Sequence, residues 1–268
     1  MARLFSITLL VLLLSTQALS TPIKLTLTGS STIAPLISEV GKLFEAKNPA
    51  TRIDVQSGGS SRGILDARQG LSQIGMVSRS LKEDEKDLAA FPIAKDGICL
   101  ITHKTNPIAS LTEAQIIAIY TGKIRRWSEV GGIDTPITVV NKAEGRSTLE
   151  LFLHYFKLRA PDIKAQVVIG DNQQGIKTVA GNPNAIGYVS IGSAEYEAKA
   201  GSPIKLLPMA NVAPTTENVR NGAFPLSRTL HLVTKGQPQG VTKNFIDFAR
   251  SKDVHGLIQE QFFVPMVQ

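Results

Sequence analysis

Strand-like and helix-like patterns of hydrophobic residues alternate along most of the chain after its first 20 residues. Residues 23–28 and 51–56 alternate polar and apolar positions with a period of two, which is typical of a half-buried strand. Between them, the apolar residues from Ile33 to Phe44 follow helical spacing, so we expect a helix there. Alternating strands and helices of this kind predict an α/β fold.

The same alternation continues into the second half of the chain, which predicts two α/β lobes that meet at a cleft. Residues 208–225 lack a regular pattern and contain several prolines, so we expect a long surface loop there. Further strands are expected at residues 73–77, 91–102, 138–140, 166–170, 185–189, 204–207 and 229–234, and further helices at residues 64–69, 111–120, 149–156, 243–250 and 254–261.

The first 20 residues have the pattern of a secretory signal peptide. Arg3 precedes an apolar stretch, residues 4–14, which is too short to span a bilayer. Ala18 and Ser20 then occupy the −3 and −1 positions of a cleavage site before Thr21. Since the only cysteine lies far downstream, at residue 99, no cysteine follows the apolar stretch to accept a lipid. We therefore expect an exported, periplasmic protein without a lipid anchor.

Composition and charge narrow the classes of ligand. Hydrophobic residues make up 43% of the chain and charged residues 19%, as in an ordinary globular protein. The net charge of +7 favours an anionic ligand by long-range attraction. It would also suit nucleic acid, but no nucleic-acid-binding motif is present and we expect none to bind. The four histidines show no metal-ligand spacing, so no metal or other cofactor is expected.

Four short segments rich in glycine, serine and threonine occupy residues 28–32, 57–63, 78–80 and 144–148. Each follows a strand-like run, and at least three open a helix-like run. A strand-to-helix turn of this kind offers free backbone N–H groups, hydroxyls and the positive end of a helix dipole. In open α/β sheets, ligands gather at the carboxyl ends of the strands, where these turns lie. Brought together, the four turns would surround a small tetrahedral oxyanion.

Three of the four turns also carry an arginine, whose planar guanidinium can hold two oxygens of one anion. Arg62, Arg79 and Arg146 compete for this role. Arg79 and Arg146 lie nearer the expected strand ends, so we favour them over Arg62. For Arg62, a position on the solvated surface explains the residue as well as a contact with the anion does.

Residues 59–63 also fit the G-x-S-x-G pattern of a nucleophile elbow, with Ser61 as the nucleophile. A secreted serine hydrolase is therefore the alternative hypothesis. It requires a catalytic histidine, and the four histidines fall within expected helices or strands rather than in a loop. The pattern alone is frequent by chance. We expect a protein that is not an enzyme.

Taken together, several segments resemble the periplasmic phosphate-binding proteins of ABC-type phosphate importers, a type II periplasmic binding protein family. The segments are residues 28–35, 59–63, 74–79, 111–127, 144–148 and 185–189. The resemblance implies a monomer of two α/β lobes joined by crossing strands, which close like a hinge over the anion. It implies residues 21–102 plus 227–268 in the first lobe and residues 103–226 in the second. It also implies capture of inorganic phosphate and its delivery to a membrane-embedded ABC permease.

The resemblance also implies a set of ligand-binding residues drawn from both lobes. With the turn residues around them, the expected ligands are Ser30, Ser31, Thr32, Gly59, Ser60, Ser61, Ser78, Arg79, Glu144, Gly145, Arg146, Ser147 and Thr148.

This chain departs from the best-known branch of the family, which carries an aspartate where Ser78 stands, an arginine where Lys142 stands and a small residue where Arg146 stands. That aspartate accepts the proton of hydrogen phosphate and repels sulfate. Glu144 is the expected substitute acceptor. Another oxyanion, or a phosphate sensor, remains an alternative.

Overall fold

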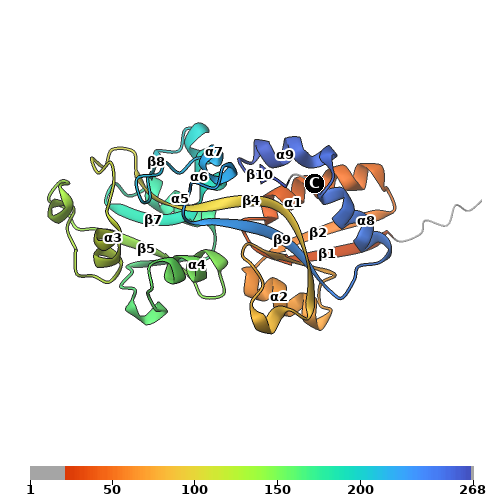
Figure 1. Ribbon diagram of the computed structural model, residues 1–268. Helices are drawn as coiled ribbons and strands as arrows, with labels where there is room; N and C mark the ends of the chain where they lie inside the picture. The colour runs from red at the N-terminus through yellow and green to blue at the C-terminus, as the bar shows by residue number, and fades with distance from the viewer. Residues whose placement is uncertain (1–21, 267–268) are drawn as a thin grey trace, which may run out of the picture.

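The computed structural model describes residues 22–266, so the expected signal peptide and its cleavage site before Thr21 lie outside the described residues. The chain forms two α/β lobes, which are linked by two long strands that run through both (Figure 1). These are β4 (Leu88–His103) and β9 (Ser227–Lys235). The predicted fold class is confirmed.

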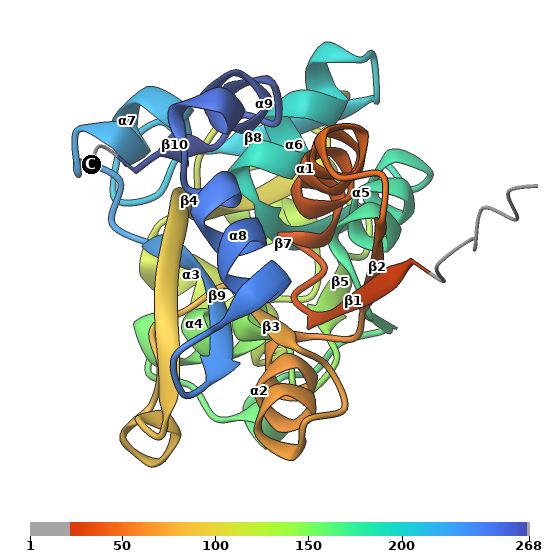
Figure 2. The same ribbon diagram turned by 90° about the vertical axis from the view of Figure 1, so that its right-hand side faces the viewer.

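The first lobe is built on a twisted sheet in which β1 lies parallel to β2 and β3. Figures 1 and 2 show α1, α8 and α9 on one face of this sheet and α2 on the other. The expected strand-to-helix alternation accounts for this arrangement, because each helix buries an apolar stripe against the sheet. The elements are β1 (Ile23–Gly29), α1 (Ala34–Lys47), β2 (Thr51–Ser57), α2 (Ser60–Gln69), β3 (Ile74–Val77), α8 (Gly240–Ala249), α9 (His255–Glu260) and β10 (Val264–Pro265), with 3₁₀ turns at Glu83–Glu85 and Lys252–Val254.

The second lobe repeats this plan, with β5 parallel to β6 and β7. In the view of Figure 1, α5 and α6 lie above the sheet and α4 lies below it. Its elements are α3 (Glu113–Tyr120), β5 (Thr138–Lys142), α4 (Ser147–Tyr155), β6 (Val167–Ile169), α5 (Asn172–Ala180), β7 (Ala185–Ser190), α6 (Ile191–Lys199), β8 (Ile204–Leu207) and α7 (Thr216–Arg220), with 3₁₀ turns at Trp127–Val130 and Ala160–Asp162.

One continuous strand order, β2-β1-β3-β9-β4-β7-β5-β6, runs through both lobes. The long strand β4 pairs with β9 as far as Gly97 and with β7 from Ile98 onward. At the passage between the lobes, Asp96 of β4 lies directly opposite Arg228 of β9. Two charged residues are therefore cross-strand neighbours at the centre of the molecule.

The buried hydrophobic residues form two large clusters, divided at the same passage. One cluster runs from Leu25 to Ala94 and resumes at Leu230. The other runs from Ile98 to Leu226 and also includes Val264. Because each cluster packs between its own sheet and helices, each lobe has a core of its own.

Residues 208–225 differ from the surface loop that the sequence predicts. They include the short helix α7, and Val219 and Phe224 are buried there. Both side chains lie against Gly97 of β4, where a Cβ would stand 3.0 Å from Val219 and 3.2 Å from Phe224. A five-residue helix is too short to show a hydrophobic period, which explains why the pattern missed it. Among residues 22–266, no helix has the length and apolar character that a bilayer span requires.

Candidate anion-binding site

The first lobe contributes three serine hydroxyls from three separate turns. Ser30 follows β1, Ser78 follows β3, and Ser60 is the first residue of α2. Ser30 Oγ donates to Ser78 Oγ at 3.0 Å, and the backbone N–H of Ser78 donates to Ser60 Oγ at 3.1 Å. All three residues are almost fully buried. The carboxyl ends of neighbouring strands meet here, as the parallel sheet predicts.

The second lobe contributes polar groups from the facing ends of β5, α4 and α5. Lys142 ends β5, Ser147 and Thr148 begin α4, and Asn172 begins α5. Lys142 Nζ donates to Asn172 Oδ1 at 2.9 Å, and Asn172 Nδ2 donates across to Thr32 Oγ1 at 3.1 Å. At this point the two lobes touch through polar side chains.

Arg228 joins the two sets of hydroxyls. Its Nη1 donates to Thr148 Oγ1 at 3.1 Å and lies 3.4 Å from Ser78 Oγ, while Nη2 donates to Thr32 Oγ1 at 3.1 Å. Asp96 Oδ2 accepts from Nε at 3.0 Å and from Nη2 at 2.8 Å, which fixes the guanidinium plane. Both charged side chains are at most 1% exposed. A guanidinium held in this way cannot turn away from the hydroxyls.

Positive charge exceeds negative charge in this cluster. Arg228 and Lys142 are buried there and Arg146 is partly buried, whereas the only fully buried carboxylate among these groups of the described chain is that of Asp96. Desolvation lowers the pKa of Lys142 to about 7; nearby Asp171 acts against this shift, and the charges of Arg228 and Arg146 add to it. Such an excess of buried positive charge is costly unless an anion offsets it.

Two further observations point to a ligand at the same place. Ser147 Oγ and Arg146 Nε are buried polar atoms with no hydrogen-bond partner in the described part of the chain. In addition, α2 and α4 begin there, after Gly59 and Arg146, without a side-chain cap. The first N–H groups of such helices have no intrahelical acceptor, and the helix dipoles favour a negative charge. The arrangement is suited to a small oxyanion that accepts several hydrogen bonds.

Other predicted site residues form the contact between the lobes. The N–H of Ser61 donates to the carbonyl of Gly145 at 3.2 Å, and Ser61 Oγ donates to Glu150 at 3.2 Å. Gly59 has a φ of +96°, and a Cβ there would stand 2.6 Å from the Gly145 carbonyl oxygen. Only glycine fits this close approach without a shift of one lobe. Arg146 packs over Gly59, with its Cδ 2.8 Å from the same Cβ position.

Two predicted ligands lie toward the outside. Glu144 is exposed, so the expected substitute for the family aspartate is not in the buried cluster. Ser31 is partly buried and lines a groove of about 300 Å³ together with Pro35, Asp171 and Asn172, the last of which belongs to the cluster. Neither residue is among the groups that surround Arg228.

Arg79, which the sequence favoured as a ligand, is engaged elsewhere. Its Nη1 and Nη2 donate to the two carboxylate oxygens of Glu85 at 2.6 and 2.8 Å, and its Nε lies 3.0 Å from Glu150 Oε2. Burial raises the pKa of Glu85, but the hydrogen bonds from Arg79 and the Lys82 backbone, together with the charges of these two residues, lower it by more, and the net shift is downward. Arg62 is half exposed and pairs with Asp66. Both guanidinium groups therefore have carboxylate partners outside the cluster.

Sequence reasoning left four residues of the cluster out of the ligand set: Lys142, Asn172, Asp96 and Arg228. A signal for Arg228 exists in the alternation of β9, where it shares the buried phase with Leu230 and Leu232. A charged residue in the buried phase of a strand requires a partner or a ligand. Asp96 gives a similar signal on β4, because it is a charged residue at the start of a buried stretch that follows exposed Lys95.

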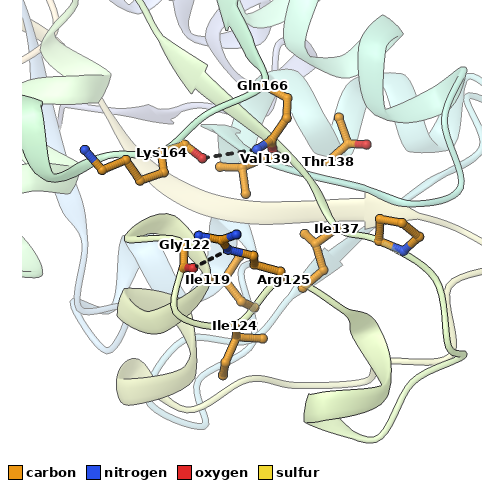
Figure 3. A pocket seen from close by; sticks show the side chains of 10 residues that line it. Ile119, Gly122, Ile124, Arg125, Ile137, Thr138, Val139, Lys164 and Gln166 are labelled. Atoms are coloured by element: carbon orange, nitrogen blue, oxygen red, sulfur yellow. Dashed lines mark hydrogen bonds between the residues drawn. The ribbon is translucent and has the colours of Figure 1, made fainter.

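Figure 3 shows a different pocket, of about 470 Å³, in the second lobe. Its walls are largely apolar, with Ile119, Ile124 and Ile137 among them. Its two cations are already engaged, since Arg125 Nε donates to the Gly122 carbonyl and Lys164 Nζ to the Pro161 carbonyl. None of the residues around Arg228 lines it, so it is separate from the buried polar cluster.

Comparison of the sequence with known proteins identifies relatives over most of the chain. The chain is 29% identical to the phosphate-binding protein PstS of Bacillus subtilis, over 90% of this chain and 80% of that protein. It is 28% identical to PstS of Borreliella burgdorferi, over 88% of each.

Solved structures give the same result. A Clostridium perfringens protein whose crystal structure contains bound phosphate matches with a TM-score of 0.83 and 34% identity, over 91% of this chain and all of that one. An ABC-type phosphate transport receptor from Vibrio cholerae matches with a TM-score of 0.74 and 29% identity, over 90% of this chain and all of that one. The model of the PBP superfamily domain matches residues 16–253. The chain therefore belongs to the PBP superfamily, which confirms the resemblance seen in its sequence.

Proposed function

We propose that this protein binds inorganic phosphate between its two lobes, outside the cytoplasmic membrane, and delivers it to a membrane-embedded ABC permease. The observation that carries the proposal is the buried polar cluster around Arg228, in which positive charge exceeds negative charge. Relatives that bear the name PstS, and a related structure that contains phosphate, support the choice of anion.

The proposed ligands differ from the predicted set. We propose Ser30, Thr32, Ser60, Ser78, Ser147, Thr148, Arg146, Lys142 and Arg228 as the groups that surround the anion. We assign Gly59, Ser61 and Gly145 to the closure of the lobes. Arg79 is not included because both sides of its guanidinium already face carboxylates. Ser31 and Glu144 are left out as well, because they lie toward the surface.

The division of the chain into lobes is also part of the proposal. The cores of the two lobes separate between Ala94 and Ile98 on β4, and between Leu226, which directly precedes β9, and Leu230 on β9. We therefore place the hinge near residues 96–97 and 227–228, a few residues before the predicted boundary at residue 102. Opening about these two strands would separate Thr148 and Asn172 from Thr32 and let the anion enter.

Binding energy in such a site comes from hydrogen bonds to a charged ligand in a water-poor interior, where they are stronger than in water. We expect micromolar affinity or better, which corresponds to about −8 kcal/mol or below. Isothermal titration of the mature protein with phosphate, arsenate and sulfate tests this directly. Phosphate and arsenate should bind tightly. Tight sulfate binding with weak phosphate binding would overturn the choice of anion, and no heat with any of the three would overturn the function.

We propose that no bond is made or broken in this site. Ser61, the residue that fits a nucleophile elbow, donates its hydroxyl proton to Glu150 rather than to a histidine. A fluorophosphonate probe should leave the protein unlabelled. Labelling that Ser61→Ala abolishes would instead support a hydrolase.

A further inference from the structure

Lys142 is a deeply buried cation of the cluster that has few polar partners. Its residue is 2% exposed, at the end of β5. In the part of the chain that the structure describes, Nζ has one hydrogen-bond partner, the amide oxygen of Asn172, and no ion pair. The one fully buried carboxylate nearby, that of Asp96, accepts from Arg228 at Oδ2 and from the backbone N–H of Gly192 at Oδ1. In the described part of the chain, an ammonium group in this position would therefore have no carboxylate in ion-pair contact.

The charged and titratable groups that face Lys142 come from every element around it. Arg146 at the start of α4 and Arg228 on β9 oppose a further positive charge, and Asp171 before α5 favours it. Asp171 is itself engaged as the cap of α5, where Oδ1 accepts from the N–H of Gln174 at 2.8 Å. The Tyr188 hydroxyl of β7 accepts from the backbone N–H of Lys142, and burial holds the pKa of this phenol above its ordinary range. The charge state of the Lys142 amine is therefore set by two nearby cations, which oppose its protonation, and by the carboxylate of Asp171, which favours it.

We propose that Lys142 is uncharged in the empty site at alkaline pH and takes up one proton when a dianion binds, so that capture of the anion is coupled to proton uptake. This inference rests on the proposed function. The step balances as follows: a buffer acid in solution loses a proton and is left as its conjugate base, the lone pair of the amine nitrogen forms an N–H bond with that proton, and the dianion becomes the counter-charge of the resulting ammonium. A neighbouring dianion stabilises the protonated form of a buried amine, because the two opposite charges attract strongly where water is scarce.

The direction of the pH effect follows from the pKa of Lys142, which burial lowers to about 7. Below this pH the lysine is already protonated, and binding requires no further proton. Above it, each bound dianion brings one proton with it. The affinity should therefore fall as the pH rises above about 7, by up to about tenfold per pH unit, until the pKa of the complex is reached.

Isothermal titration with phosphate at about pH 8.5, in two buffers of different ionisation enthalpy, measures the protons taken up. Free phosphate is already a dianion at this pH, so the uptake measures a proton that the complex gains on binding, and the Lys142 variants show whether Lys142 receives it. The wild type should take up close to one proton. Lys142→Arg, whose guanidinium is always charged, should take up none and should bind with an affinity that no longer falls above neutral pH. Lys205→Arg is the matched control, since burial also lowers the pKa of Lys205 on β8 and this residue lies outside the cluster.

Phosphate binding by the wild type without proton uptake at about pH 8.5 would overturn this inference and leave the proposed function intact. Uptake that persists in Lys142→Arg would also overturn it. If the larger arginine prevents binding, Lys142→Met provides the second test, because a neutral side chain there should bind phosphate more weakly and without uptake. Absence of phosphate binding at every pH would overturn the proposed function, and this inference with it.

Discussion

Replacement of Arg228 by methionine should weaken both the fold and the site, for reasons that a second mutation can separate. The side chains of Arg228 and Asp96 are at most 1% exposed and share two hydrogen bonds. Arg228→Met leaves the Asp96 carboxylate buried without its partner, which costs about 3–5 kcal/mol. That is a large share of the roughly 5–15 kcal/mol by which proteins are stable.

The double variant Arg228→Met/Asp96→Asn removes the stranded charge. Its free energy of unfolding should recover part of the loss, with a coupling energy of about 2 kcal/mol between the two positions. Phosphate binding should not recover, because the guanidinium that holds the hydroxyls of Thr32 and Thr148 is still missing. Loss of hydrogen bonds to a charged group costs about 1.5–3 kcal/mol, which weakens binding roughly 10- to 150-fold.

Urea unfolding and isothermal titration of the wild type, both single variants and the double variant complete the cycle. Arg228→Met with an unfolding free energy within about 0.5 kcal/mol of the wild type would refute the reasoning on stability. A double variant that binds phosphate as tightly as the wild type would refute the reasoning on the site.

Three further changes test the contact between the lobes and the positive charge of the site. Gly59→Ala should weaken phosphate binding at least tenfold, because its Cβ would meet the carbonyl of the facing lobe. The control is Gly70→Ala, which is also at positive φ but has open space around its Cβ and should bind as the wild type does. Equal phosphate affinities of the two variants in isothermal titration would contradict this. Arg146→Ala should also weaken phosphate binding at least tenfold in the same assay. The control Arg62→Ala should not, since the guanidinium of Arg62 pairs with Asp66 near the surface. An unchanged affinity of Arg146→Ala would exclude Arg146 from the site. Glu150→Gln removes the carboxylate that pairs with Arg79 and Lys82 of the opposite lobe. The affinity for phosphate should fall about fivefold, or about 1 kcal/mol, and small-angle scattering should show a more open shape. A variant as closed as the wild type would contradict this.

The turns that carry the hydroxyls could be predicted from the sequence because their physics is local. A glycine- and serine-rich segment after an alternating run indicates a strand that ends in a helix start. The parallel sheet then places such ends together, which is how Ser30 and Ser78 come within 3.0 Å although they lie 48 residues apart. The predicted α/β lobes follow from the same local patterns.

The arginines could not be assigned from local patterns. Arg79 stands in one of the predicted turns, but its guanidinium is held by Glu85 and Glu150, and the second of these comes from the other lobe. Arg228 stands in a strand and reaches Asp96 across 132 residues of sequence. Which arginine faces the cluster depends on which carboxylates lie beside each, and only the folded chain decides that. The alternation along β9 gives one indication of this in the sequence, because Arg228 is a charged residue in phase with the buried Leu230 and Leu232.

The most direct test of the account is a crystal structure of the protein with arsenate, whose anomalous scattering locates the anion without ambiguity. The account predicts one strong peak between the two lobes, within hydrogen-bond distance of Arg228, Ser147 and Thr148. A peak in the pocket beside Arg125, or on the outer surface near Glu144, with the cluster around Arg228 empty, would contradict it.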